Sequence, residues 1–224
     1  MISPHVVISG PCAWNSLLFV PALPQPEPHM IVVDDFYDTF GGTSLGKCMN
    51  LSELGCDVTI VTQFGSDEMG HMICDLLTHV GATVINCESR MTERHTNIMA
   101  ADGQRLSFYL TSPPPSSGQR DDEILQAMST ADAIVMDLSA ESARLLPAIR
   151  TMSAPVWVDL HDYDGRAQFH EPFLEAADVV VMSADKLDDP VSTMHDALTK
   201  ASLHTHQTLR SRHIHPVVDA ILAS

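Results

Sequence analysis

Basic residues are scarce in this sequence. Its 224 residues include 12 Lys and Arg against 29 Asp and Glu, which gives a formal net charge of -17. Binding to a nucleic-acid backbone or to an anionic membrane surface depends on clustered Lys and Arg, so the composition argues against both partners. A small anionic ligand is still compatible with this charge, because a few backbone amides and one cationic side chain can form a local positive site.

Paired cysteines, a leader-like start and long apolar runs are also lacking. The five cysteines show no CxxC pair and no regular spacing, which indicates reduced thiols in a cytosolic protein. The first residues contain no basic segment of the kind that opens a signal peptide. No apolar run approaches the roughly 18 to 20 residues of a membrane-spanning helix. We therefore expect a cytoplasmic protein without a membrane partner.

The chain does contain a regular alternation of short apolar strands and helices, separated by Gly, Pro and Asp. From residue 121 onward, helices alternate with the runs AIVMD, VWVDL and DVVVM, which predicts a parallel sheet covered on both faces. The first half adds predicted strands at 5–9, 57–62 and 82–87 and predicted helices at 43–54 and 66–80.

Two β-prone regions do not fit that sheet. The dipeptide Asp-Gly at 102–103 lies between two β-like runs within 95–110, which is a strong hairpin signal. Residues 30–40 resemble a strand with one face in water. Four prolines within 20–28 predict an extended loop. We therefore expect a separate small β layer, built from segments near 12–40 and 95–110.

Glycines recur in a fixed order between Phe40 and Val84. A Gly pair opens a helix, Leu-Gly ends it, a strand follows, and Gly-x-Asp-x-x-Gly opens the next helix. The matching positions are Gly41, Gly42, Leu54, Gly55, Gly65, Asp67, Gly70 and Gly81. Turn glycines of a Rossmann-like protein are one interpretation. The order and spacing also resemble the first signature of the PfkB, or ribokinase-like, carbohydrate kinases, and the resemblance covers roughly residues 5–190.

This resemblance implies an α/β fold, namely a ribokinase-like three-layer sandwich with a mostly parallel sheet and a small β-lid. It also implies transfer of phosphate from ATP, with Mg²⁺, to a hydroxyl of a sugar or sugar-like alcohol. Glycines lack a Cβ and let the backbone approach a ligand closely, so Gly41 and Gly42 are expected to form the floor of a sugar pocket. By resemblance, Asn15 takes the place of an acidic sugar ligand and Gly46 that of an Asn.

Further positions follow from the ends of the later strands. His161 comes after a strand that ends in Asp159, where open α/β sheets bind ligands, and it is expected to contact the substrate. The family's Asn-x-x-Glu motif, which organises magnesium and phosphates, is replaced by Ser-Ala-Asp-Lys at 183–186. Ser183 and Asp185 are therefore the expected cofactor-binding positions, and no metal-ligating residue is predicted.

The second signature of the family, which supplies the glycine amides and the catalytic Asp, has no full counterpart. Its only echo is the run VDAILA at 218–223, which makes Asp219 the candidate catalytic base. We therefore expect a ribokinase-like domain at 1–200 followed by a divergent or truncated tail at 201–224. The alternative to a working kinase is a non-catalytic sugar-binding or truncated homologue.

A third interpretation comes from the run GGTSLGKC at 41–48, which nearly matches the phosphate-binding loop GxxxxGK[ST] of P-loop NTPases. Cys48 stands where a hydroxyl should bind magnesium, and a thiol is a poor ligand for that ion. As partners we expect a sugar-like small molecule and, through the exposed apolar face of the β-lid, a second copy of the chain.

Overall fold

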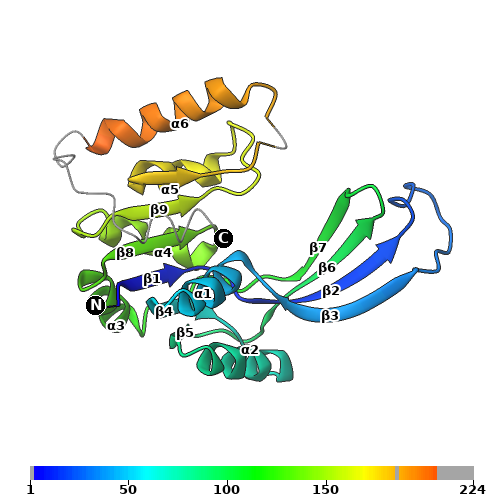
Figure 1. Ribbon diagram of the computed structural model, residues 1–224, viewed down its shortest axis with the longest axis horizontal. Coiled ribbons are helices and arrows are strands. Elements are labelled where there is room, and N and C mark those ends of the chain that lie inside the picture. Colours follow the sequence, from blue (N-terminus) through cyan, green and yellow to red (C-terminus); the bar gives the residue numbers. More distant parts are fainter. Residues whose placement is uncertain (1–2, 185–186, 206–224) are drawn as a thin grey trace.

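Two β-sheets organise the protein. The structure is a computed structural model that describes residues 3–184 and 187–205, with side chains through Lys200. A six-stranded parallel sheet has the order β10-β9-β8-β1-β4-β5, and a four-stranded mixed sheet has the order β3-β2-β6-β7 (Figure 1). The predicted α/β fold with a separate small β layer is therefore confirmed.

The parallel sheet consists of short, mostly buried strands. A strand covered on both faces needs a continuous apolar run, as in AIVMD of β8, all five residues of which are buried. The strands are β1 (His5–Ser9), β4 (Asp57–Gln63), β5 (Thr83–Cys87), β8 (Ala133–Asp137), β9 (Val156–Asp159) and β10 (Val179–Val181).

Helices cover both faces of this sheet and complete three layers. One face packs against α1 (Thr43–Glu53) and α2 (Glu68–His79) through residues such as Leu45 and Ile73. The opposite face packs against the remaining helices through residues such as Leu145 and Phe173. Those helices are α3 (Asp121–Ser129), α4 (Ala140–Ile149), α5 (Glu171–Ala176) and α6 (Pro190–Thr205), with a 3-10 turn at Gln168–His170. Among the described residues no helix has the length and apolarity needed to cross a bilayer.

The small sheet extends away from the α/β body, to the right in Figure 1. Its strands are β2 (Ala13–Val20), β3 (Asp35–Gly41), β6 (Glu93–Ala100) and β7 (Arg105–Thr111). The predicted hairpin is confirmed as β6 and β7. The predicted strand at 30–40 begins only at Asp35, because Asp35 pairs with Phe19 near the end of β2 and the preceding residues have no strand to pair with.

Residues alternate between the two faces of the small sheet, and the pairing registers show which residues share a face. We call the face that carries Glu93 and Tyr109 the inner face, because these two side chains meet the carboxyl ends of the parallel strands. The inner face comprises residues 13, 15, 17, 19, 35, 37, 39, 41, 93, 95, 97, 99, 105, 107 and 109. The outer face comprises residues 14, 16, 18, 20, 36, 38, 40, 94, 96, 98, 100, 106 and 108.

The expected division into a domain at 1–200 and a tail at 201–224 stays a prediction. Helix α6 continues to Thr205, five residues into the expected tail, and it packs against α5. The rest of the expected tail lies outside the described residues.

Candidate functional site

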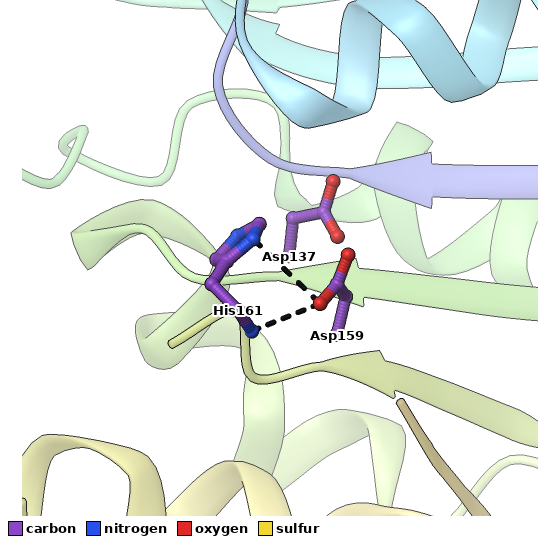
Figure 2. A group of neighbouring side chains, drawn as sticks. All are labelled: Asp137, Asp159 and His161. Carbon is purple, nitrogen blue, oxygen red and sulfur yellow. Dashed lines mark hydrogen bonds and ion pairs between the residues drawn. The ribbon is translucent and has the colours of Figure 1, made fainter. Parts of the chain in front are cut away.

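Two carboxylates lie side by side at one edge of the parallel sheet. Asp137 ends β8, Asp159 ends β9, and the two residues are paired in the register of these neighbouring strands. His161 follows β9, so that one ligand atom from each of the three side chains lies within 4.8 Å of the other two (Figure 2). Parallel strands bring their carboxyl ends to the same edge, and this edge is where open α/β sheets bind ligands.

The start of α1 directs three more polar side chains at Asp137. The hydroxyls of Thr43 and Ser44 donate hydrogen bonds to Asp137 Oδ2 at 3.0 and 2.6 Å. Lys47 Nζ lies one turn further and contacts Asp137 Oδ1 and Asp159 Oδ2, each at 2.8 Å. We call the six residues the strand-end cluster: Thr43, Ser44, Lys47, Asp137, Asp159 and His161.

The strand-end cluster holds its charges in a largely buried setting. Burial would lower the pKa of Lys47, but the carboxylates of Asp137 and Asp159 outweigh it and raise the pKa above the ordinary lysine value. Burial would likewise raise the pKa of Asp159, but His161, Lys47 and the hydrogen bonds it accepts lower it below the ordinary value. Lys47 therefore stays protonated and Asp159 ionised at neutral pH.

His161 is held in a conformation that is uncommon outside glycine. Its φ is 51°, in the left-handed region. Its N–H donates to Asp159 Oδ1 at 2.9 Å, and its carbonyl accepts a hydrogen bond from the Ser183 N–H at 2.6 Å. Thr43 Oγ1 lies 3.5 Å from His161 Nε2. The imidazole is thus fixed over the gap between the two carboxylates and α1.

The glycines of the motif make close contacts within the chain itself. A Cβ at Gly41 would overlap the amide of Asn15, and a Cβ at Gly42 would overlap the carbonyl oxygen of Pro11. Gly42 also has φ 90° and is the N-cap of α1. The expected sugar-pocket floor stays a prediction, since neither Gly41 nor Gly42 lines the cavity beneath the small sheet or the cavity beside α6. The glycines allow the end of β3 to pack closely beside β2 and then turn into α1.

A cavity of about 150 Å³ lies between the small sheet and the strand ends, next to the strand-end cluster. Glu93 and Tyr109 line it from the inner face, and Gly10, Ser139 and Glu141 line it from the α/β body. A Cβ at Gly10 would overlap Ser44 Oγ, so the wall of the cavity is also the packing surface of the strand-end cluster.

The structure brings together some of the other predicted site residues. Asn15 lies on the inner face, and its Oδ1 is buried without a hydrogen-bond partner among the described residues. A Cβ at Gly46, on α1 beside Lys47, would meet no atom within 4 Å, so the missing Asn side chain leaves open space. Ser183 follows β10 near His161. Asp185 and Asp219 lie outside the described residues.

Comparisons with known proteins place the architecture. No family model matches the chain. A curated relative, acarbose 7(IV)-phosphotransferase of Actinoplanes sp., is 26% identical over 198 residues, which are 87% of this chain and 66% of the relative. The chain thus spans slightly less than two thirds of that protein.

Solved structures agree with this relationship. A microbiome-derived acarbose kinase matches with a TM-score of 0.70 at 23% identity, covering 89% of this chain and 67% of that one. Ribokinase from Giardia lamblia matches with a TM-score of 0.75 at 14% identity, covering 90% and 66%. Ribokinase from Arabidopsis thaliana, solved with ribose and ATP, gives 0.67 at 16% identity, covering 91% and 70%. The chain has the ribokinase-like fold.

The ribokinase-like fold removes the P-loop interpretation. A P-loop is a loop that connects a buried strand to a helix and wraps around phosphates. Here residues 43–48 are the first turns of α1, and the preceding strand β3 belongs to the small sheet and is exposed over its first four residues. Lys47, which would contact the phosphates, is instead paired with two carboxylates.

Magnesium and a nucleotide do not fit the described residues of this ribokinase-like chain. The ammonium of Lys47 already lies between the carboxylates that could bind a divalent ion. A second cavity, of about 570 Å³, adjoins α6, and its charged lining consists of four carboxylates, Arg166 and Lys200. A triphosphate would meet net repulsion there. The strand-end cluster and this second cavity therefore do not suit the ATP and Mg²⁺ expected from the resemblance, and binding of both stays a proposal.

Of the strand-end cluster, only His161 was predicted as a site residue from the sequence, and Thr43, Ser44, Lys47, Asp137 and Asp159 were missed. Asp137 could have been found, since it ends a buried strand in the same way as Asp159, and adjacent parallel strands place such residues together. Lys47 gave no such signal. Its contacts depend on how α1 crosses the sheet, which the local sequence does not specify.

Replacing Glu141 with Gln is expected to lower the free energy of unfolding at pH 7 by about 2 kcal/mol, because hydrogen bonds to a buried charge are lost. Glu141 is 3% exposed, pairs with Arg144 at 2.6 Å and accepts from Ser116 N–H at 2.7 Å. Burial would raise the pKa of Glu141, but Arg144 and Ser116 lower it below its ordinary value.

Because the pKa of Glu141 is lower in the folded than in the unfolded protein, its carboxylate contributes fully to stability above the ordinary Glu pKa of about 4.3. This stabilisation is lost as the pH falls through the pKa of the folded state. Urea unfolding of Glu141→Gln and wild type should therefore differ at pH 7 and converge in acid. Glu123→Gln, which loses an exposed pair with Arg120, is the control and should change stability by less than about 1 kcal/mol. A pH-independent difference for Glu141→Gln would contradict the assignment.

Proposed function

We propose that this chain takes part in ATP-dependent phosphorylation of a saccharide hydroxyl and that its described residues form the acceptor side of the site. The observation that carries the proposal is the strand-end cluster, in which an ionised carboxylate and an imidazole meet at the carboxyl ends of the parallel strands. Support comes from the ribokinase-like fold and from the similarity to a phosphotransferase that acts on acarbose.

Two members of the strand-end cluster are best placed to contact the saccharide. Asp137 accepts from Thr43, Ser44 and Lys47 and has a fully buried side chain, so it positions its neighbours. The side chains of Asp159 and His161 are 18% and 28% exposed. A saccharide hydroxyl can donate a hydrogen bond to Asp159 Oδ1, and another can donate to or accept from the imidazole of His161.

Asn15, on the inner face of the small sheet, offers a further contact. Its buried Oδ1 lacks a partner, and an unsatisfied buried acceptor costs about 1 to 3 kcal/mol until a donor reaches it. A ligand hydroxyl beneath the inner face would supply that donor. The base that removes the proton from the reacting hydroxyl, predicted at Asp219, lies outside the described residues, so no proton transfer is assigned.

Calorimetry separates the kinase from the non-catalytic alternative. The chain is titrated with acarbose and ribose, each with and without millimolar MgATP, and ADP release is measured in the same samples. A working kinase should bind a saccharide, bind MgATP and release ADP only when both are present. Heat on titration with a saccharide but none with MgATP would favour a non-catalytic saccharide-binding protein. The acidic lining of the second cavity supports this alternative. Binding of neither saccharide nor MgATP would refute the proposal.

We also propose a homodimer through the outer face of the small sheet. Phe36, Leu106 and Phe108 are 69%, 39% and 47% exposed there, next to the partly buried Leu18 and Ile98. Contiguous exposed apolar side chains of this kind mark association surfaces. Replacing Phe36 with Asp is expected to weaken association at least tenfold in light scattering, because a charge would be desolvated in the interface. A wild-type chain that is monomeric at all concentrations would contradict the dimer.

The proposed cytoplasmic location rests on the cysteines. All five are free thiols, and three of them are buried. Burial is the main cause that raises the pKa of Cys12 and of Cys87 to about 12, so both stay protonated and unreactive at neutral pH. Free thiols are typical of reducing compartments.

A further inference from the structure

Two aromatic pairs lie on the inner face of the small sheet. Near the α/β body, the rings of His95 and Tyr109 have centroids 3.9 Å apart. Farther out, Phe19 and Tyr37 are stacked with centroids 5.5 Å apart and an interplanar angle of 27°. Tyr109 is 67% exposed and Tyr37 is 48% exposed, so each pair presents one ring to solvent and keeps the other behind it as support.

Polar side chains occupy the inner face between the two pairs. Asn97 accepts a hydrogen bond from the Ser107 hydroxyl at 2.7 Å, and its side chain is fixed because the residue is 7% exposed. Thr39 and Asn15 lie in the same register row as His95. The inner face therefore carries aromatic rings together with hydroxyl and amide groups, with Leu17 between Asn97 and Tyr37, whereas the outer face at the same level carries Phe36, Leu106 and Phe108.

The inner aromatic pairs are too far apart to contact one sugar ring. Tyr109 and Tyr37 are separated by three strand spacings and two residues along the strands, which corresponds to about 16 Å. Tyr109 lines the cavity beside the strand-end cluster. The Phe19–Tyr37 pair lies near the end of β2 and the start of β3, and these ends of the two strands extend beyond the α/β body (Figure 1). A ligand that touches both pairs must therefore be longer than a monosaccharide.

We propose that the inner face is an extended saccharide-binding surface and that the chain binds an oligosaccharide. One terminal unit lies at the strand-end cluster, the next units pass Asn97 and Ser107, and a distal unit stacks on Tyr37. Pyranose rings expose apolar C–H faces that stack on aromatic rings, while their hydroxyls pair with amides and hydroxyls, which matches this combination of groups. The identity of the reacting terminus rests on the proposed function, but the binding surface does not.

Adjacent residues of β3 provide a matched pair of variants. Tyr37 lies on the inner face and Phe36 on the outer face, and both are exposed aromatic residues. Wild type, Tyr37→Ala and Phe36→Ala are titrated calorimetrically, without nucleotide, with glucose, maltose, maltotriose and maltotetraose and with the β-linked series from cellobiose to cellotetraose. Light scattering of the same samples reports their assembly state.

Affinity is expected to rise with chain length in one of the two series, by at least tenfold from the monosaccharide to the tetrasaccharide. Tyr37→Ala should remove at least a tenfold part of that gain and leave glucose binding unchanged, whereas Phe36→Ala should leave the length dependence intact. Length-independent affinity, an equal effect of both variants, or no binding of any of these saccharides would overturn the proposal. So would a Tyr37→Ala variant that changes assembly alone, since a second copy would then cover the inner face. Phosphorylation of a monosaccharide without any Tyr37 effect would refute the extended surface and leave the kinase proposal standing.

Discussion

Replacing Lys47 with Met is expected to lower the free energy of unfolding by about 3 kcal/mol, because Lys47 is the cation shared by two largely buried ion pairs. The Lys47 side chain is 15% exposed, and it contacts Asp137, which is fully buried, and Asp159, which is 18% exposed. Without the ammonium, two carboxylates would face each other across the strand ends in a medium that screens them poorly. Urea unfolding at pH 7 measures the effect.

Two further variants test the cause of that loss. Lys200→Met removes a lysine of similar length whose Nζ lies 3.9 Å from Glu171 on the surface, and it should cost less than about 1 kcal/mol. Asp159→Asn in the Lys47→Met background should recover part of the lost stability, because it removes one of the unpaired charges. Equal effects of Lys47→Met and Lys200→Met would show that the strand-end cluster is not held by its charges.

Gly42→Ala is expected to destabilise the protein by about 3 kcal/mol. An L-residue at φ 90° is strained by about 1 to 2 kcal/mol, and the added Cβ would overlap the carbonyl oxygen of Pro11, a backbone atom that cannot rotate away. Because Gly42 is the N-cap of α1, the shift would also move Ser44 and Lys47 relative to Asp137. Thermal or urea unfolding gives the magnitude.

Gly46→Ala, four residues further along α1, is the matched control. Its Cβ would meet no atom within 4 Å, and Ala is favoured over Gly inside a helix by about 0.5 to 1 kcal/mol, so this variant should be slightly more stable than wild type. Equal stability of Gly42→Ala and Gly46→Ala would contradict the close packing of the turn from β3 into α1.

Local sequence signals predicted much of the fold because they describe local structure. Buried apolar runs predicted the parallel strands. Asp67 was predicted near the start of α2, where its side chain accepts a hydrogen bond from Gly70 N–H at 2.8 Å. The hairpin followed from Asp-Gly, whose Gly103 has φ 88°. Strand β2 was not predicted as a separate strand within the β layer expected near 12–40, because its length is set by pairing with β3 and with β6, about 80 residues away.

The site residues named from the resemblance stay predictions. Asn15, Gly41 and His161 were placed by resemblance, and the structure puts Asn15 against Gly41 and His161 beside Asp159. The role expected for the glycines is different from the contacts observed, because their close approach is to the chain itself. Lys47 was missed because a long side chain can reach many groups, and only the packing of α1 selects its two carboxylates.

The inner and outer faces of the small sheet also separate what the local sequence predicts from what only the packing determines. Alternation within Asp35–Gly41 predicts that neighbouring residues point in opposite directions, but the sequence alone does not say which set faces the strand ends. The pairing registers and the cavity lining answer that question, since Glu93 and Tyr109 face the α/β body. An inner face that binds saccharide and an outer face that binds a second copy therefore require opposite responses from Tyr37 and Phe36.

The most direct test of the strand-end cluster as an acceptor site is transfer of labelled phosphate from γ-labelled ATP to acarbose, ribose and the two oligosaccharide series. A labelled saccharide is expected with wild type and Lys200→Met, and about tenfold less or lower still with Asp159→Asn. Labelled product formed equally by wild type and Asp159→Asn, or no labelled product with any of these saccharides, would contradict an acceptor site at the strand-end cluster.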